Sequence, residues 1–107
     1  MKEMIREYLE TNLGIDDEET AQMLLDSYLE TMTDGIAKID GILPGGDFTE
    51  LARAVHALKG CSANIGAKPL HECCLALEAA AKGHDRESAQ KHFASLRQLR
   101  DELAQEI

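Results

Sequence analysis

The sequence has few aromatic residues, with no tryptophan, two tyrosines and two phenylalanines among its 107 residues. Hydrophobic residues still make up 44% of the chain. This is enough for one modest core, so we expect a single domain over residues 1–107. That core must be built mainly of leucine, isoleucine, alanine and methionine, which suits helices packed on helices better than a sheet.

Long apolar runs and paired cysteines are also missing. No stretch approaches the roughly 20 apolar residues that span a bilayer, and the N-terminal segment MKEMIREYLE lacks the apolar region of a signal peptide. The cysteines Cys61, Cys73 and Cys74 are odd in number and two of them are adjacent, which argues against a disulfide framework. We therefore expect a cytoplasmic protein with reduced thiols.

Positive charge is scarce. The chain has 11 lysines and arginines against 20 aspartates and glutamates, which gives a formal net charge of -9 at pH 7. The phosphates of a nucleic acid or of an anionic membrane surface would repel such a protein. We expect neither as a partner.

Helix-breaking residues divide the chain into segments of helical length and period. Capping signatures mark two helix starts, Asp16 with Glu19 and Asp47 with Glu50. Four long helices joined by short turns predict an all-α fold, an antiparallel up-down four-helix bundle with a short N-terminal capping helix. The expected helical segments are residues 2–12, 16–43, 47–65, 69–83 and 85–107. Apolar stripes should turn three of these segments toward the core: Ala21, Leu25, Tyr28, Met32, Ile36, Ile39 and Leu43 in the second, Leu70, Cys73, Cys74, Leu77 and Ala81 in the fourth, and Ala89, Phe93, Leu96, Leu99, Leu103 and Ile107 in the fifth.

His56 lies on the polar side of the third segment. At about 100° per residue, the apolar residues of this segment gather on one side of the helix and His56 falls nearly opposite their centre. Its neighbours on that face are small, Ala52, Gly60 and Ala63, so the imidazole should stand clear. A glycine inside a helix costs about 1 kcal/mol relative to alanine, which suggests that side-chain bulk is unwelcome at Gly60.

The chemistry of this face fits a phosphoryl group. A neutral imidazole with an ordinary pKa of about 6.5 has a free lone pair that can attack phosphorus. Lys59, one turn from His56, can donate charge-assisted hydrogen bonds to phosphoryl oxygens. No acidic residue occurs between Glu50 and Glu72, so the local field should be positive. We interpret His56 as a phosphoacceptor, because phosphoryl transfer needs mainly alignment and charge stabilisation.

The same residues closely resemble the signature of histidine-containing phosphotransfer (HPt) domains. That signature is a histidine followed by x-L-K-G and two small residues, then G-A, and then L and C-x-x-L-E on the next helix. The chain has HALKGCS at 56–62, IGA at 65–67, and CLALE at 74–78. The spacing extends over two helices and their turn, which makes it far more specific than a histidine and a lysine alone.

The resemblance implies a role for each of four residues. His56 would be the phosphoacceptor, Lys59 would stabilise the phosphoryl group, and Gly60 would keep the approach open. Glu78 would either hold the second ring nitrogen of His56 or pair with Lys59.

The resemblance also implies the partners. The phosphoryl group would come from an aspartate on a receiver domain and pass to another, between a hybrid histidine kinase and a response regulator. The Mg²⁺ would sit on the receiver domain, with no cofactor in this chain and no kinase activity of its own; the sequence has no glycine-rich nucleotide loop. We expect a monomer.

Two alternatives stay open. The chain could be an HPt-like interaction module that binds or sequesters a receiver domain without carrying phosphate. It could also be a segment of a larger kinase, although Met1 at its start favours a free-standing protein.

Overall fold

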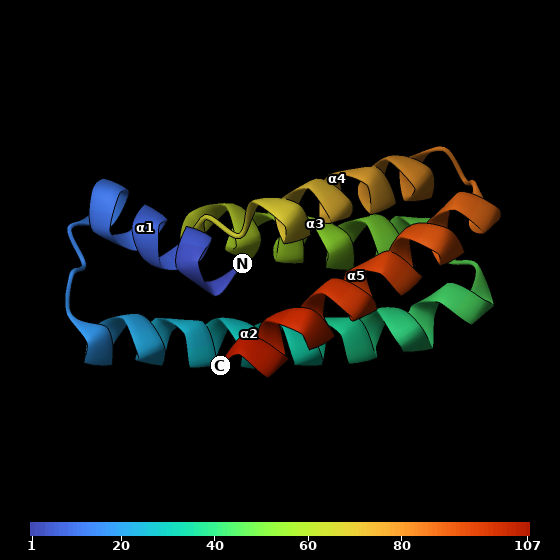
Figure 1. Ribbon diagram of the computed structural model, residues 1–107. Helices are drawn as coiled ribbons and strands as arrows, with labels where there is room; N and C mark the ends of the chain where they lie inside the picture. The colour runs from blue at the N-terminus through green and yellow to red at the C-terminus, as the bar shows by residue number, and fades with distance from the viewer.

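The computed structural model describes all 107 residues and contains helices but no strands. This confirms the predicted all-α class (Figure 1). The elements are α1 (Lys2–Leu13), α2 (Glu18–Ile42), the short 3-10 helix η1 (Leu43–Gly45), α3 (Phe48–Ile65), α4 (Lys68–Lys82) and α5 (Arg86–Glu106).

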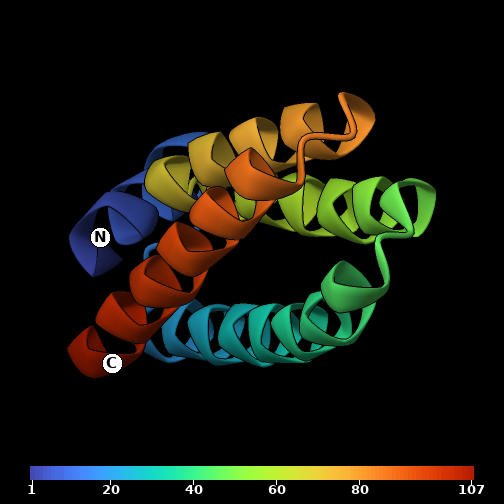
Figure 2. The same cartoon turned by 90° about the vertical axis from the view of Figure 1, so that its right-hand side faces the viewer.

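The long helices α2 to α5 run up and down in turn, so that consecutive helices are antiparallel (Figures 1 and 2). Helix α5 crosses α2 obliquely, and the bundle is elongated, 43 × 22 × 17 Å. Helix α1 covers the end at which α3 turns into α4, where the ring of Tyr8 packs against Gly66. The short N-terminal helix therefore caps the bundle, as the sequence predicted.

Side-chain caps fix where α2, α3 and α5 begin. The carboxylate of Asp47 accepts the backbone N–H of Glu50 (3.0 Å) at the start of α3. The left-handed conformation of Gly66 (φ 74°) ends α3, a conformation that suits glycine. The turn between α3 and α4, on which the site depends, is thus set locally by residues readable in the sequence.

One predicted cap is wrong by one residue. Helix α2 is capped by Asp17 rather than Asp16: its carboxylate accepts both the backbone N–H (2.9 Å) and the hydroxyl hydrogen (2.6 Å) of Thr20. The capping box with Glu19 does not form. Asp17 is favoured because Thr20 adds a side-chain hydrogen bond that a glutamate in that register would not donate.

The core follows the predicted apolar stripes, with corrections at the edges. Every stripe residue of α2 is buried: Ala21, Leu25, Tyr28, Met32, Ile36, Ile39 and the adjoining Leu43. On α5, however, Leu99 is only half-buried, and Ile107, which follows the end of the helix at Glu106, is exposed. Cys73, expected to face the core, is also half-buried, and its thiol donates to the backbone carbonyl of His92 (3.3 Å).

Ser62 makes two polar contacts between α3 and α2 inside the core, and in one of them its hydroxyl donates to the sulfur of Met32 at 3.9 Å. The hydroxyl of Tyr28 on α2 hydrogen-bonds that of Ser62 on α3 at 2.6 Å. Burial raises the pKa of Tyr28 well above its ordinary value, so the hydroxyl keeps its proton. None of the helices combines the length and the apolar character needed to cross a bilayer.

Candidate phosphoacceptor site

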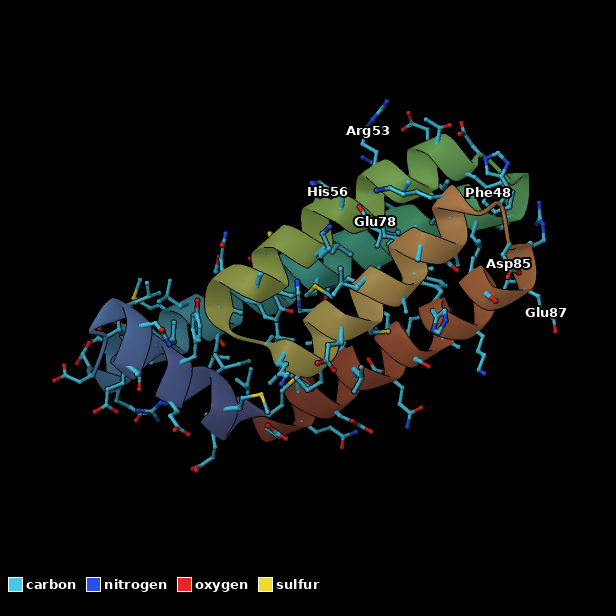
Figure 3. All side chains as sticks on the ribbon, turned by 90° about the horizontal axis from the view of Figure 1, so that it is seen from above. Phe48, Arg53, His56, Glu78, Asp85 and Glu87 are labelled. Carbon is cyan, nitrogen blue, oxygen red and sulfur yellow. The ribbon has the colours of Figure 1, made fainter.

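Helices α3 and α4 pack side by side and bring His56 and Glu78 together on one outer face of the bundle (Figure 3). Val55 and Leu58 lie close to His56 in the sequence but on the core-facing side of α3, where both are buried. This packing fixes the rotation of α3 and turns the imidazole outward. The side chain of His56 is 68% exposed.

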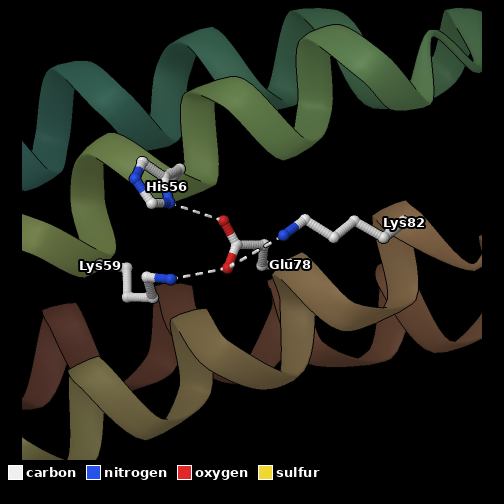
Figure 4. Close-up of polar contacts among 4 residues, drawn as sticks. All are labelled: His56, Lys59, Glu78 and Lys82. Atoms are coloured by element: carbon white, nitrogen blue, oxygen red, sulfur yellow. Dashed lines mark hydrogen bonds and ion pairs between the residues drawn. The ribbon is translucent and has the colours of Figure 1, made fainter.

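Glu78 contacts both residues that the sequence analysis offered as alternatives. Its Oε2 lies 2.8 Å from Nδ1 of His56, and its Oε1 accepts a hydrogen bond from Nζ of Lys59 at 2.8 Å (Figure 4). The Glu78 side chain is only 8% exposed, whereas that of Lys59 is 22% exposed. The carboxylate thus joins the two α3 side chains from the neighbouring helix.

The contact with Glu78 determines the state of the imidazole. A carboxylate only accepts, so Nδ1 of His56 must carry the proton and donate it. In the neutral ring the other nitrogen, Nε2, then holds the lone pair, and no group of the protein hydrogen-bonds it. The site therefore combines a ring nitrogen that is free in solvent with one that is held in place.

Glu78 is ionised despite its burial. The hydrogen bond from Lys59 is the largest influence and lowers the pKa of Glu78 below its ordinary value, and the contact with His56 lowers it further. Burial acts in the opposite direction but does not prevail. The carboxylate is therefore available as an acceptor throughout the neutral pH range.

Lys82 is a further member of this cluster that the sequence analysis missed. Its Nζ lies 4.0 Å from Oε1 of Glu78, and its side chain is 68% exposed (Figure 4). The spacing of Glu78 and Lys82, four residues apart on one helix, is the standard arrangement of an intrahelical ion pair. The sequence alone therefore contained an indication of this ion pair.

The surroundings of His56 are less positive than the sequence suggested. The interval without acidic residues lies on α3 and the following turn, but α4 places the carboxylate of Glu78 directly beside the ring. Lys59 is also already engaged by Glu78. A prediction made along one helix could not include the charge that the next helix supplies.

Gly60 has no structural reason to be a glycine. A Cβ added there would meet no atom within 4 Å, whereas one added at Gly35 would collide with the side chain of Leu58. Gly35 thus serves close packing between α2 and α3, and Gly60 does not. The surface one turn beyond His56 is open.

The remaining histidines and cysteines form no comparable cluster. No group of three or more histidine, cysteine, aspartate or glutamate side chains is placed to share a metal ion. Burial raises the pKa of the Cys74 thiol to about 12. This residue behaves as a small core side chain.

The family model that matches this chain is the Hpt domain, over residues 23–106. The chain belongs to the Hpt domain family. Neither a curated protein nor a solved structure matches it significantly. Hpt domains are phosphotransfer modules of two-component phosphorelays, are not kinases, and interact with receiver domains. Membership indicates that this protein takes part in such a phosphorelay, and the matched segment contains all four predicted site residues.

Proposed function

We propose that this Hpt protein carries a phosphoryl group on His56, taking it from an aspartate of one receiver domain and passing it to that of another. One observation supports this above all. The imidazole exposes Nε2 to solvent while Glu78 holds Nδ1 at 2.8 Å. A histidine that only faced solvent would need no buried carboxylate behind it.

The proposed transfer forms one bond and breaks one, and needs only the imidazole of His56 and the donor aspartyl phosphate. The lone pair of Nε2 attacks phosphorus, an N–P bond forms, and the P–O bond to the donor aspartate breaks, with its electron pair left on the aspartate carboxylate. The ring keeps its Nδ1 proton and gains positive charge, which the carboxylate of Glu78 stabilises. The reverse steps release the phosphoryl group to the second aspartate.

Lys59 and Gly60 assist from the same face of α3. The ammonium group of Lys59 lies one turn from His56 and can donate to the phosphoryl oxygens as charge develops on them. The open surface at Gly60 leaves room for the receiver domain that carries the acyl phosphate. The partner would supply Mg²⁺ and the acidic residues that hold it, and this chain would bind no cofactor.

The role implies a place in the pathway. The protein would act between a hybrid histidine kinase and a response regulator, as a monomer and in the compartment of its receiver partners, the cytoplasm. It would not take phosphate from ATP.

The direct test mixes the protein with a radiolabelled, phosphorylated receiver domain. We expect acid-labile, alkali-stable label on the small protein, its loss in His56→Gln, and its retention in His92→Gln, a control on α5 with the same chemical change. Label that persists in His56→Gln would refute the proposal. Binding of the receiver domain without any label would favour the sequestering module instead.

A further inference from the structure

Glu78 is surrounded by more positive groups than one carboxylate requires. His56 and Lys59 reach it from α3, and Lys82 approaches it along α4. The two lysines differ in setting: the side chain of Lys59 is 22% exposed and hydrogen-bonded to Oε1, whereas that of Lys82 is 68% exposed and stands 4.0 Å from the same oxygen. Lys82 therefore forms a long ion pair with the carboxylate but no hydrogen bond to it.

Phosphorylation of His56 would disturb this arrangement. Because Nδ1 faces Glu78, the phosphoryl group on Nε2 lies on the far side of the ring. The new negative charge would attract the ammonium group of Lys59, and its movement toward the phosphoryl oxygens would weaken its hydrogen bond to Oε1. Glu78 would then keep the ring of His56 at Oε2 but lose the hydrogen bond from Lys59 at Oε1, and an acceptor that is left unpaired in a side chain only 8% exposed is costly.

We propose that Lys82 is a positioning residue that takes over as the counter-ion of Glu78 when Lys59 turns to the phosphoryl group on His56. The Nζ of Lys82 needs to move only about 1 Å to reach hydrogen-bond distance of Oε1, and its exposed, flexible side chain can do so without a change in α4. Glu78 then stays ionised and keeps its hydrogen bond to Nδ1 throughout the transfer. This inference rests on the proposed function of His56.

The kinetic test compares transfer from a phosphorylated receiver domain to the wild type, Lys82→Met and Lys82→Arg. We expect Lys82→Met to slow the transfer about two- to fivefold, the range that one exposed ion pair supports, and Lys82→Arg to restore the rate. Lys91→Met is the matched control, since it removes the same charge from an exposed position on α5. It should leave the rate unchanged.

A double-variant cycle separates this role from direct contact with phosphate. In a Glu78→Gln background there is no carboxylate charge to balance, so Lys82→Met should have no further effect. If Lys82→Met slows transfer equally in both backgrounds, Lys82 touches the phosphoryl group itself and the proposal is wrong. An unchanged rate in Lys82→Met with Glu78 present would also overturn it.

A second measurement needs no phosphate. Lys59→Met imitates the departure of Lys59, and the titration of the Glu78 carboxyl carbon can be followed by NMR with and without Lys82→Met. We expect the pKa of Glu78 to be higher when both lysines are absent than when only Lys59 is absent. Coincident titration curves would overturn the proposal.

Failure of the proposed function and failure of this inference give different results. If His56 is not a phosphoacceptor, no variant is labelled but the titration curves still differ. If only the role of Lys82 is wrong, label appears and the curves coincide.

Discussion

Gly60 offers a substitution whose effects on stability and on transfer should have opposite signs. It lies in the interior of α3, and an added Cβ would meet nothing within 4 Å. Gly60→Ala should therefore stabilise the fold by about 1 kcal/mol, the difference in helix propensity between the two residues. For a domain of this size, that corresponds to a rise in Tm of about 4–8 °C.

The same position should control access to His56. Residues four apart on a helix have their Cβ atoms about 5–6 Å from each other on one face, so a long side chain at position 60 would stand in the path of the receiver domain. We expect transfer to decrease from the wild type to Gly60→Ala and to fall at least tenfold in Gly60→Gln, about 1.4 kcal/mol in barrier. Urea unfolding followed by circular dichroism and single-turnover transfer assays measure the two effects.

Gly41 provides the control, because it is also helical and a Cβ there would also meet nothing within 4 Å. It lies in the last turn of α2, so Gly41→Ala should stabilise the protein without slowing transfer. A loss of stability in Gly60→Ala would refute the open-surface geometry. An unchanged transfer rate in Gly60→Gln would refute the argument that this surface must stay clear.

Three further outcomes are expected. The hydrogen bond from Lys59 lowers the pKa of Glu78 below its ordinary value of 4.5. The ionised carboxylate therefore stabilises the fold fully above pH 4.5, and this stabilisation is lost as the pH falls through the lowered pKa. The difference in unfolding free energy between the wild type and Glu78→Gln should shrink on acidification. Tyr28→Phe leaves the buried hydroxyl of Ser62 without its 2.6 Å partner, which should cost about 1–3 kcal/mol in urea unfolding, partly recovered by adding Ser62→Ala. Burial raises the pKa of the Cys74 thiol to about 12, so iodoacetamide should modify it more slowly than the half-buried Cys61, as mass spectrometry would show.

Each of the three predictions would be contradicted by a specific result. A difference for Glu78→Gln that does not change with pH would mean that the carboxylate gains nothing from its partners. A neutral Tyr28→Phe would show that the contact with Ser62 does not stabilise the core. Equal modification of the two thiols would contradict their different burial.

The helices were predictable where the sequence contains local stop and start signals. Asp47 at the start of α3, Gly66 at its end and Pro69 in the first turn of α4 each act within a few residues of themselves, so these helix ends could be placed without knowledge of the fold. The start of α2 was less certain because Asp16 and Asp17 are both capping residues, and the choice depended on the hydroxyl of Thr20.

The candidate site was predictable on α3 but not between helices. Periodicity alone turned His56 and Gly60 away from the core, and both are exposed as expected. The contacts of Glu78 depend on how α4 is rotated against α3. The apolar period of α4 alone does not determine that rotation. For this reason the double contact of Glu78 and the approach of Lys82 emerged only in three dimensions.

The proposed transfer requires that His56 use Nε2 as its nucleophile while Glu78 holds Nδ1. Long-range proton–nitrogen NMR of the histidine ring, recorded before and after phosphorylation by a receiver domain, tests it most directly. We expect a proton on Nδ1 in the free protein and the phosphoryl group on Nε2 afterwards. A phosphoryl group on Nδ1, or a free ring protonated only at Nε2, would contradict it.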